Sequence, residues 1–169
     1  HFDLTDQTDI IMGTFSKSLA SVGGFIAAEE DIIHYLKHNS RALIFSASLP
    51  PASAASVLAA LDIMRDEPER IEKLWENTNF MLHEFKLMGY NTGTSNTPVI
   101  PLHIGEDIVT LKMWKLLGDE GVFINPVVPP GVPQNDSLIR CSFMATHSKE
   151  QLEMALCKFE KVGKLLQVI

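Results

Sequence analysis

Two short apolar runs, at 8–14 and 24–28, open the chain, and the polar segment FSKSLASVG connects them. Short apolar runs bounded by small and polar residues are typical of strands that lie inside a sheet. We therefore predict a buried strand over 8–14 and another over 24–28. Lys17 then follows the end of a buried strand, a place where lysines are uncommon.

Residues 29–89 alternate between helical and extended patterns. The segment 29–40 begins with acidic residues and predicts a helix, whereas 41–48, RALIFSAS, predicts a short extended segment that ends before Pro50 and Pro51. A helix over 52–64 stops before Pro68, because proline disfavours a helical residue in front of it. A longer helix over 68–88, ending at Gly89, carries its apolar residues near one face, and these are Ile71, Leu74, Trp75, Met81, Leu82 and Phe85.

The remaining chain reads as a mixture of strands and helices. Strands are predicted over 97–104 and 121–125 around a helix over 107–120, and the alternating segment 137–144 predicts a third strand. Ser148 and Gln151 match a capping box for a final helix that runs to about residue 166. The fold class is therefore α/β, with the end of a larger domain over 1–65 and a smaller α+β domain over 66–169.

Composition and charge narrow the functional classes. The 169 residues are 46% hydrophobic, and 14 basic against 21 acidic residues give a net charge of −7, so we expect no nucleic acid as a partner. No apolar run approaches the roughly 18 residues of a membrane span. Two cysteines are too few for a disulfide framework and favour a reducing cytoplasm. The first residues, HFDLTDQTD, lack an initiator methionine and a signal peptide, and we interpret them as a cut into a longer chain.

Three interpretations of Lys17 compete. The first is a solvated lysine in a turn. The second is a phosphate-binding P-loop, but Ser16 and Ile11 stand where that motif needs its two glycines, so we reject it. The third is a nucleophilic amine that forms a Schiff base with a carbonyl cofactor, because an amine in an apolar pocket loses part of its affinity for a proton. The neighbours suit pyridoxal phosphate, since Thr14 and Ser16 offer hydroxyls to a phosphate.

The segment GTFSKSLASVGGF resembles the cofactor-lysine signature of the α-oxoamine synthases. These are fold-type I pyridoxal-phosphate (PLP) enzymes that condense an amino acid with an acyl-CoA and release CO₂. The segments RALIFSASLPPASAASVLAALDIM and LIRCSFMATHSKEQLEMAL are similar to later parts of the same family, in the same order. Within the family, INPVVPPGVPQNDSLIR most resembles the bacterial serine palmitoyltransferase branch, which joins L-serine to a long-chain acyl-CoA to give a 3-ketosphinganine, CoA and CO₂. Branches that use glycine or alanine, the 8-amino-7-oxononanoate synthases and the 2-amino-3-ketobutyrate CoA ligases, share much of the pattern.

The resemblance implies a role for each matching residue. Lys17 would hold the cofactor and then move protons at the substrate α-carbon. Thr14 would bind the cofactor phosphate, and Ser46 would reach the phosphate of the partner subunit's cofactor, which implies a homodimer with shared active sites. Ser46 read by itself is a turn hydroxyl before the two prolines.

Arg140 interrupts the apolar strand LIRCSF, where a charge is costly unless it is paired. Guanidinium grips a carboxylate through two hydrogen bonds, and the resemblance implies that Arg140 binds the α-carboxylate of the amino acid. The alternative is a structural ion pair with an acidic neighbour. The segment VVPPGVP fits a stiff loop on the substrate side or an ordinary connector.

Other candidates carry less chemistry, and part of the expected site is missing. His34 and His38 lack the glutamate of an HExxH motif, so we expect no metal site, and we expect Cys141 to be a buried hydrophobe and the stripe of Trp75, Phe85 and Met88 to be core. In the family, an aspartate for the pyridine nitrogen, a ring-stacking histidine and a helix start for the phosphate precede the lysine by tens of residues. Only sixteen residues precede Lys17 here, so we expect the chain alone to be inactive. A catalytically dead subunit that stabilises or regulates a partner is the rival from a different class.

Overall fold

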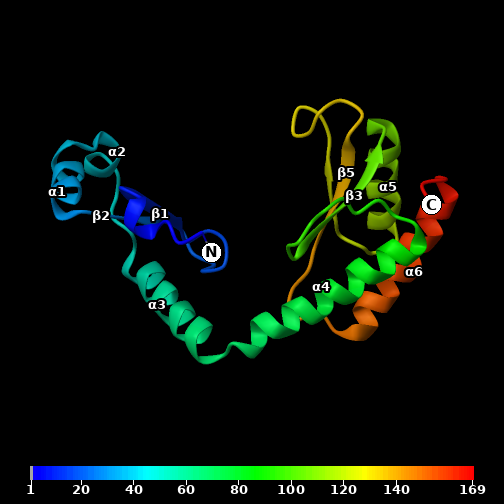
Figure 1. Cartoon of the computed structure of the whole chain (residues 1–169), viewed down its shortest axis with the longest axis horizontal. Coiled ribbons are helices and arrows are strands. Elements are labelled where there is room, and N and C mark those ends of the chain that lie inside the picture. The colour runs from blue at the N-terminus through cyan, green and yellow to red at the C-terminus, as the bar shows by residue number, and fades with distance from the viewer. Residues whose placement is uncertain (1) are drawn as a thin grey trace. The chain divides into compact units, whose positions relative to one another are not determined.

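The structure is a computed structural model that describes residues 2–169. The chain divides into two compact units, unit 1 over residues 1–67 and unit 2 over residues 68–169. Both units mix helices with antiparallel strands (Figure 1).

Unit 1 is built from a strand hairpin followed by helices. Its elements are the 3₁₀ turn η1 (Thr5–Gln7), strands β1 (Ile10–Thr14) and β2 (Gly24–Ala28), and helices α1 (Glu30–Asn39), α2 (Arg41–Ile44) and α3 (Pro51–Asp66). The two strands pair antiparallel from Ile10 opposite Ala28 to Thr14 opposite Gly24. The predicted strands and the predicted helices around 29–40 and 52–64 are confirmed.

The hairpin requires glycine where its strands approach most closely. A Cβ atom on Gly24 would lie 2.5 Å from the backbone oxygen of Gly13, and a Cβ atom on Gly13 would lie 2.2 Å from the ring of Phe25. The exposed ring of Phe25 could move aside for a side chain at Gly13, whereas the backbone oxygen that faces Gly24 cannot, so the end of the hairpin next to Thr14 depends on glycine at position 24.

The prediction of an extended segment over 41–48 is wrong for its first half. Residues 41–44 form α2, in which the amide of Ile44 donates to the carbonyl of Ser40 and the amide of Phe45 donates to Arg41. A short apolar run fits a helical turn as well as it fits a strand, and here local hydrogen bonds form because no neighbouring strand pairs with the segment.

The expectation that 8–14 forms a buried strand is also wrong in this chain. The side chains of β1 are exposed apart from half-buried Gly13, and Val57 alone is buried among the described residues 2–67. Among the described residues, the sheet of unit 1 consists of β1 and β2 alone, and although α1 contacts β2, most of the apolar side chains of the two strands remain exposed.

Unit 2 is a three-stranded sheet packed by helices. Its elements are α4 (Glu69–Met88), β3 (Val99–Gly105), α5 (Asp107–Asp119), β4 (Asn125–Val127), β5 (Ser137–Ser142) and α6 (Lys149–Leu165). The strand order is β3-β5-β4, with β5 antiparallel to both neighbours. Helix α5 contacts all three strands, and α6 contacts α4 and α5 (Figure 1).

The core of unit 2 lies between the helices and one face of the sheet. Side chains from α4, α5 and α6 meet alternate residues of β3 and β5, and the cluster comprises Met81, Phe85, Tyr90, Ile100, Leu102, Met113, Leu117, Ile139, Cys141, Leu152, Leu156, Phe159 and Val162. The rings of Phe85, Tyr90 and Phe159 meet edge to face, with centroids 4.9–6.2 Å apart.

Two predicted ends of helices in unit 2 are confirmed. Gly89 ends α4 with a left-handed backbone at φ 96°. Ser148 and Gln151 form the reciprocal hydrogen bonds of a capping box at the start of α6. Local polar chemistry therefore sets where these helices begin and end.

Other predictions for unit 2 need correction. The strand expected over 121–125 begins only at Asn125, because Gly121 has a positive φ of 86° and the amide of Val122 still donates to Leu117 of α5. On α4, Ile71 and Trp75 are exposed rather than part of the core.

Among residues 2–169, no helix is both long enough and apolar enough to cross a lipid bilayer.

Candidate active site

The lysine lies in the loop that joins β1 to β2. The loop is closed by backbone hydrogen bonds, in which the amide of Phe15 donates to Gly23 (3.0 Å) and the amide of Ser21 donates to Phe15 (2.9 Å). The amide of Ala20 donates to the carbonyl of Lys17, and Gly23 has a φ of +103° that favours glycine. Lys17 therefore sits on a loop with a defined turn, anchored at both ends by the hairpin.

Two hydroxyls lie together immediately before the lysine. Thr14 Oγ1 and Ser16 Oγ are 2.8 Å apart, and the backbone amide of Ser16 donates to Thr14 Oγ1 at 3.2 Å. Both residues are exposed. Neutral hydroxyls that donate hydrogen bonds are suitable ligands for a phosphate oxygen.

Lys17 itself is exposed, which corrects the expectation that it is enclosed by a buried strand. Its amine forms no hydrogen bond or ion pair with any residue of the described chain. The described residues therefore leave the amine free to react, but they do not supply the apolar enclosure that would remove it from water.

An apolar cleft of about 570 Å³ lies between the hairpin and α1. Thr14 and Gly24 line it from the hairpin, and Lys37 lines it from the last turn of α1. Sequence reasoning did not single out Lys37, because nothing in its spacing distinguishes it from a lysine on a solvated helix. Its signal is positional, since the helix that follows the lysine hairpin returns toward Thr14.

Ser46 lies just after α2, and its side chain donates to the carbonyl of Leu43 at 3.3 Å. Ser46 is exposed, and no hydrogen bond joins it to the lysine loop in the described part of unit 1. The structure therefore groups Thr14, at the end of β1, with Ser16 and Lys17 of the following loop, and leaves Ser46 on a separate segment.

Arg140 lies on β5, the central strand of the sheet in unit 2. The strand alternates, so that Ile139 and Cys141 are buried while Arg140 is exposed on the opposite face. The expectation of a costly buried charge is therefore wrong in this chain. The guanidinium forms no ion pair with any described residue, so the structural ion pair proposed as the alternative is not formed within residues 2–169.

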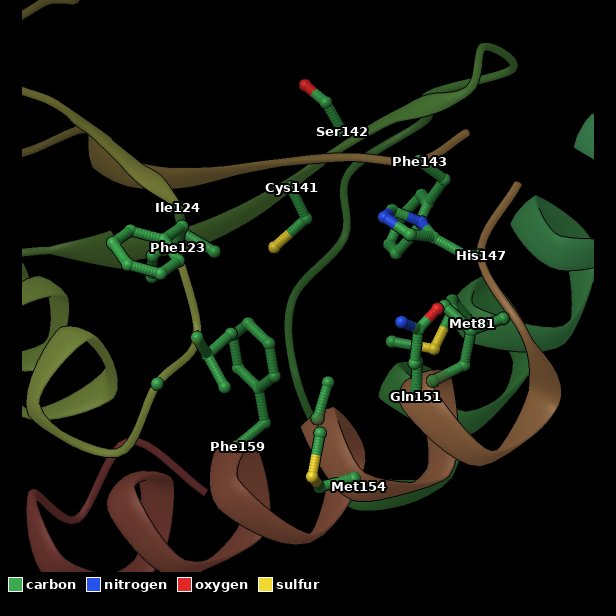
Figure 2. A pocket seen from close by; sticks show the side chains of 14 residues that line it. Met81, Phe123, Ile124, Cys141, Ser142, Phe143, His147, Gln151, Met154 and Phe159 are labelled. Carbon is green, nitrogen blue, oxygen red and sulfur yellow. The ribbon is translucent and has the colours of Figure 1, made fainter. Parts of the chain in front are cut away.

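A pocket of about 350 Å³ in unit 2 lies between the β5 end of the sheet and α6 (Figure 2). It is lined mainly by apolar side chains, among them Phe123, Ile124, Met154 and Phe159, and the sulfur of Cys141 points into it. Burial raises the pKa of the Cys141 thiol well above its usual range. A thiol that stays protonated is a poor nucleophile, so Cys141 contributes packing surface to this pocket rather than nucleophilic chemistry.

Comparisons with known proteins show which family the chain belongs to. The family described as aminotransferase class I and II matches residues 1–159. A serine palmitoyltransferase from Bacteroides ovatus is 52% identical over 169 residues, which is 100% of this chain and 43% of that protein. An 8-amino-7-oxononanoate synthase from Thermoanaerobacter pseudethanolicus is 40% identical over 169 residues, again 100% of this chain and 43% of that protein.

A solved high-resolution structure of serine palmitoyltransferase (SPT) with PLP internal aldimine superposes on this chain with a TM-score of 0.90 at 31% identity. The match covers 99% of this chain and 42% of that one. The chain belongs to the aminotransferase class I and II family. Its fold is that of the fold-type I PLP-dependent transferases, as the sequence predicted. The chain spans less than half the length of the relatives that it matches.

Proposed function

We propose that this chain is part of a PLP-dependent enzyme that condenses L-serine with a long-chain acyl-CoA and releases CoA and CO₂. The observation that carries the proposal is the amine of Lys17, which has no hydrogen-bond or ion-pair partner among residues 2–169 and follows the adjacent hydroxyls of Thr14 and Ser16. Residues 1–65 would form the end of the large cofactor-binding domain, and 66–169 the small domain.

The residues present fit PLP in two respects. The cofactor has an aldehyde, which an unpaired amine can hold covalently, and a phosphate, which donor hydroxyls can bind. Lys17 would take the first role, and Thr14, with Ser16 beside it, the second. When bound, PLP supplies an electron sink for bond cleavage at the α-carbon of an amino acid.

The protein's own contribution to the reaction is proton transfer and positioning. The Lys17 amine would accept the proton from the substrate α-carbon and later return one. The short loop between β1 and β2 limits how far the amine can move, so the proton is exchanged at one atom of the substrate.

Arg140 would bind the α-carboxylate of the amino acid. It is exposed, it has no ion-pair partner among the described residues, and its planar guanidinium matches a carboxylate with two parallel hydrogen bonds. Fixing the carboxylate determines which bond at the α-carbon is aligned for cleavage.

Ser46 supports a dimeric enzyme. Ser46 is exposed and lies apart from the lysine loop, and its hydroxyl would exchange the long hydrogen bond to Leu43 (3.3 Å) for one to the phosphate of a partner subunit's cofactor. We therefore propose a homodimer with shared active sites, and the two free cysteines favour a cytoplasmic location. Mixing Lys17→Ala with Ser46→Ala subunits tests the homodimer, because subunit exchange should restore one complete site, and a fully active monomer at high dilution would contradict it.

Two rival functions have specific support. The 40% identity to an 8-amino-7-oxononanoate synthase favours a different amino acid and acyl-CoA. The exposed apolar side chains of unit 1, where Val57 alone is buried in the described part, favour a subunit that must associate with another polypeptide. The higher identity to a serine palmitoyltransferase, 52%, favours the serine-dependent reaction.

The reaction is tested with the PLP-loaded holoenzyme that contains this chain. CoA release is measured with a long-chain acyl-CoA and either L-serine, L-alanine or glycine, and the product is identified by mass spectrometry. We expect the highest kcat/KM with L-serine. The product formed from serine should be heavier than the product formed from glycine, because a hydroxymethyl group replaces a hydrogen atom. A preference for alanine or glycine would replace serine as the substrate, and the absence of CoA release with all three would favour the non-catalytic rival.

A further inference from the structure

The sheet of unit 2 has a second face, opposite the core, which we call the open face. Its side chains are set by the strand register and comprise Val99, Pro101 and His103 of β3, Asn125 and Val127 of β4, and Leu138, Arg140 and Ser142 of β5. Three of these residues, Asn125, Arg140 and Ser142, are exposed. The open face is therefore where unit 2 presents Arg140 to a ligand.

Arg140 has a different neighbour on each side. On β3 it pairs directly with Pro101, and on β4 it pairs directly with Asn125. A proline side chain has no group that donates or accepts a hydrogen bond, whereas a carboxamide does both. Asn125 is therefore the polar residue directly beside Arg140 on the open face.

The pairing brings the two side chains within reach of each other. Directly opposed residues in an antiparallel pair have Cβ atoms about 4.5–5.5 Å apart. Asparagine is much shorter than arginine, so its carboxamide reaches the inner part of the arginine side chain, near Nε, rather than the terminal nitrogens. Neither side chain has a hydrogen-bond partner among the described residues, so both are available.

We propose that Asn125 is a positioning residue for Arg140. When the substrate carboxylate binds, the carboxamide oxygen of Asn125 would accept a hydrogen bond from the Nε–H of Arg140, a bond that the ligand-free chain does not form, and would leave the two terminal nitrogens to the substrate carboxylate. This inference rests on the proposed function in one respect, the role of Arg140 as the carboxylate-binding residue.

The choice of an amide follows from electrostatics. A carboxylate at position 125 would pair with the guanidinium and compete with the substrate carboxylate for it. A carboxamide orients the guanidinium without neutralising its charge. The proposal therefore predicts that Asn125→Asp, which keeps nearly the same shape but adds a negative charge, weakens serine binding more than Asn125→Ala does.

The test measures steady-state kinetics of the PLP-loaded holoenzyme for four variants. Asn125→Ala should raise the KM for serine about 2- to 10-fold, the factor that corresponds to one ordinary hydrogen bond. Asn125→Asp should raise it further than Asn125→Ala does. The kcat and the KM for acyl-CoA should change much less in both. Arg140→Ala reports whether the arginine binds serine at all. The matched control is Asn96→Ala, which replaces an exposed asparagine outside the sheet and should leave the KM for serine unchanged.

The outcomes separate this inference from the proposed function. If Arg140→Ala raises the KM for serine but neither Asn125 variant does, the positioning role is wrong and the proposed function stands. If Arg140→Ala leaves the KM unchanged, the assignment of Arg140 itself has failed, and the role of Asn125 falls with it. An Asn125→Asp variant that binds serine better than Asn125→Ala would overturn the electrostatic argument. If Asn125→Ala does not fold, Asn125→Val, which suits a strand and also lacks the carboxamide, takes its place in the comparison with Asn125→Asp.

Discussion

Gly163 tests the packing in unit 2. Replacing a glycine inside a helix with alanine usually raises the free energy of unfolding, but here we expect the replacement to lower it. Gly163 lies inside α6 and is buried. A Cβ atom placed on it would lie 2.3 Å from the hydroxyl oxygen of Tyr90, and 3.0 Å from two side-chain carbons of Ile169. That hydroxyl donates to the backbone carbonyl of Phe159 at 2.8 Å. The glycine therefore makes room for a buried hydrogen bond.

The magnitude follows from three contributions to the free energy of unfolding. Glycine to alanine inside a helix normally adds about 1 kcal/mol of stability. Against this, forcing a methyl group into filled space costs about 1–3 kcal/mol, and displacing the Tyr90 hydroxyl loses a hydrogen bond that contributes about 0.5–1.5 kcal/mol. We expect Gly163→Ala to destabilise unit 2 by about 1–3 kcal/mol in sum.

Tryptophan fluorescence during urea unfolding measures this directly, because both tryptophans, Trp75 and Trp114, lie in unit 2. Tyr90→Phe is the companion variant, since it removes the hydroxyl while keeping the ring. In that background the cost of Gly163→Ala should fall by about 1 kcal/mol or more, because neighbouring sites couple. A Gly163→Ala protein more stable than the parent would refute the close approach of Tyr90 and Gly163.

Two further predictions concern titration and thiol reactivity in unit 2. Hydrogen bonds from Lys158 and Lys161 lower the pKa of Glu120 to about 2, so the carboxylate stabilises the fold above its ordinary pKa of 4.5, and this contribution disappears as the pH falls towards 2. The stability difference between the parent and Glu120→Gln, measured by urea unfolding at several pH values, should therefore shrink across that window, and a constant difference would contradict the assignment. A thiol-alkylating reagent should modify exposed Cys157 rapidly and buried Cys141 only after unit 2 unfolds; mass spectrometry showing equal rates for the two would rule out the packing around Cys141.

The sequence predicts best where local chemistry determines the structure. Ser148 and Gln151 specify the start of α6 by their own hydrogen bonds, and Gly89 ends α4 by adopting a left-handed backbone. The alternation of β5 places Arg140 and Cys141 on opposite faces, as expected, because a strand has a period of two. None of these features depends on distant residues.

Predictions that depend on tertiary context were less accurate. Residues 41–44 are apolar enough for a strand, but they close a helical turn because no strand pairs with them. Lys17 and Arg140 were expected in apolar surroundings, yet both are exposed, since the described chain has no side chains that cover them. The pairing of Asn125 with Arg140 could not be predicted from the sequence. The register of β4 against β5 depends on where the loop between the two strands begins and ends.

The central claim is that Lys17 holds the cofactor, and borohydride reduction of the PLP-loaded holoenzyme tests it most directly. Reduction fixes the cofactor to the amine that carries it, and digestion followed by mass spectrometry then identifies the labelled lysine. Lys17→Ala removes the proposed amine, and Lys37→Ala is the matched control because Lys37 lines the cleft beside Thr14. We predict that the label lies on the peptide containing Lys17, disappears in Lys17→Ala and persists in Lys37→Ala. A label on any other lysine of the parent enzyme, or an undiminished label in Lys17→Ala, would contradict the account.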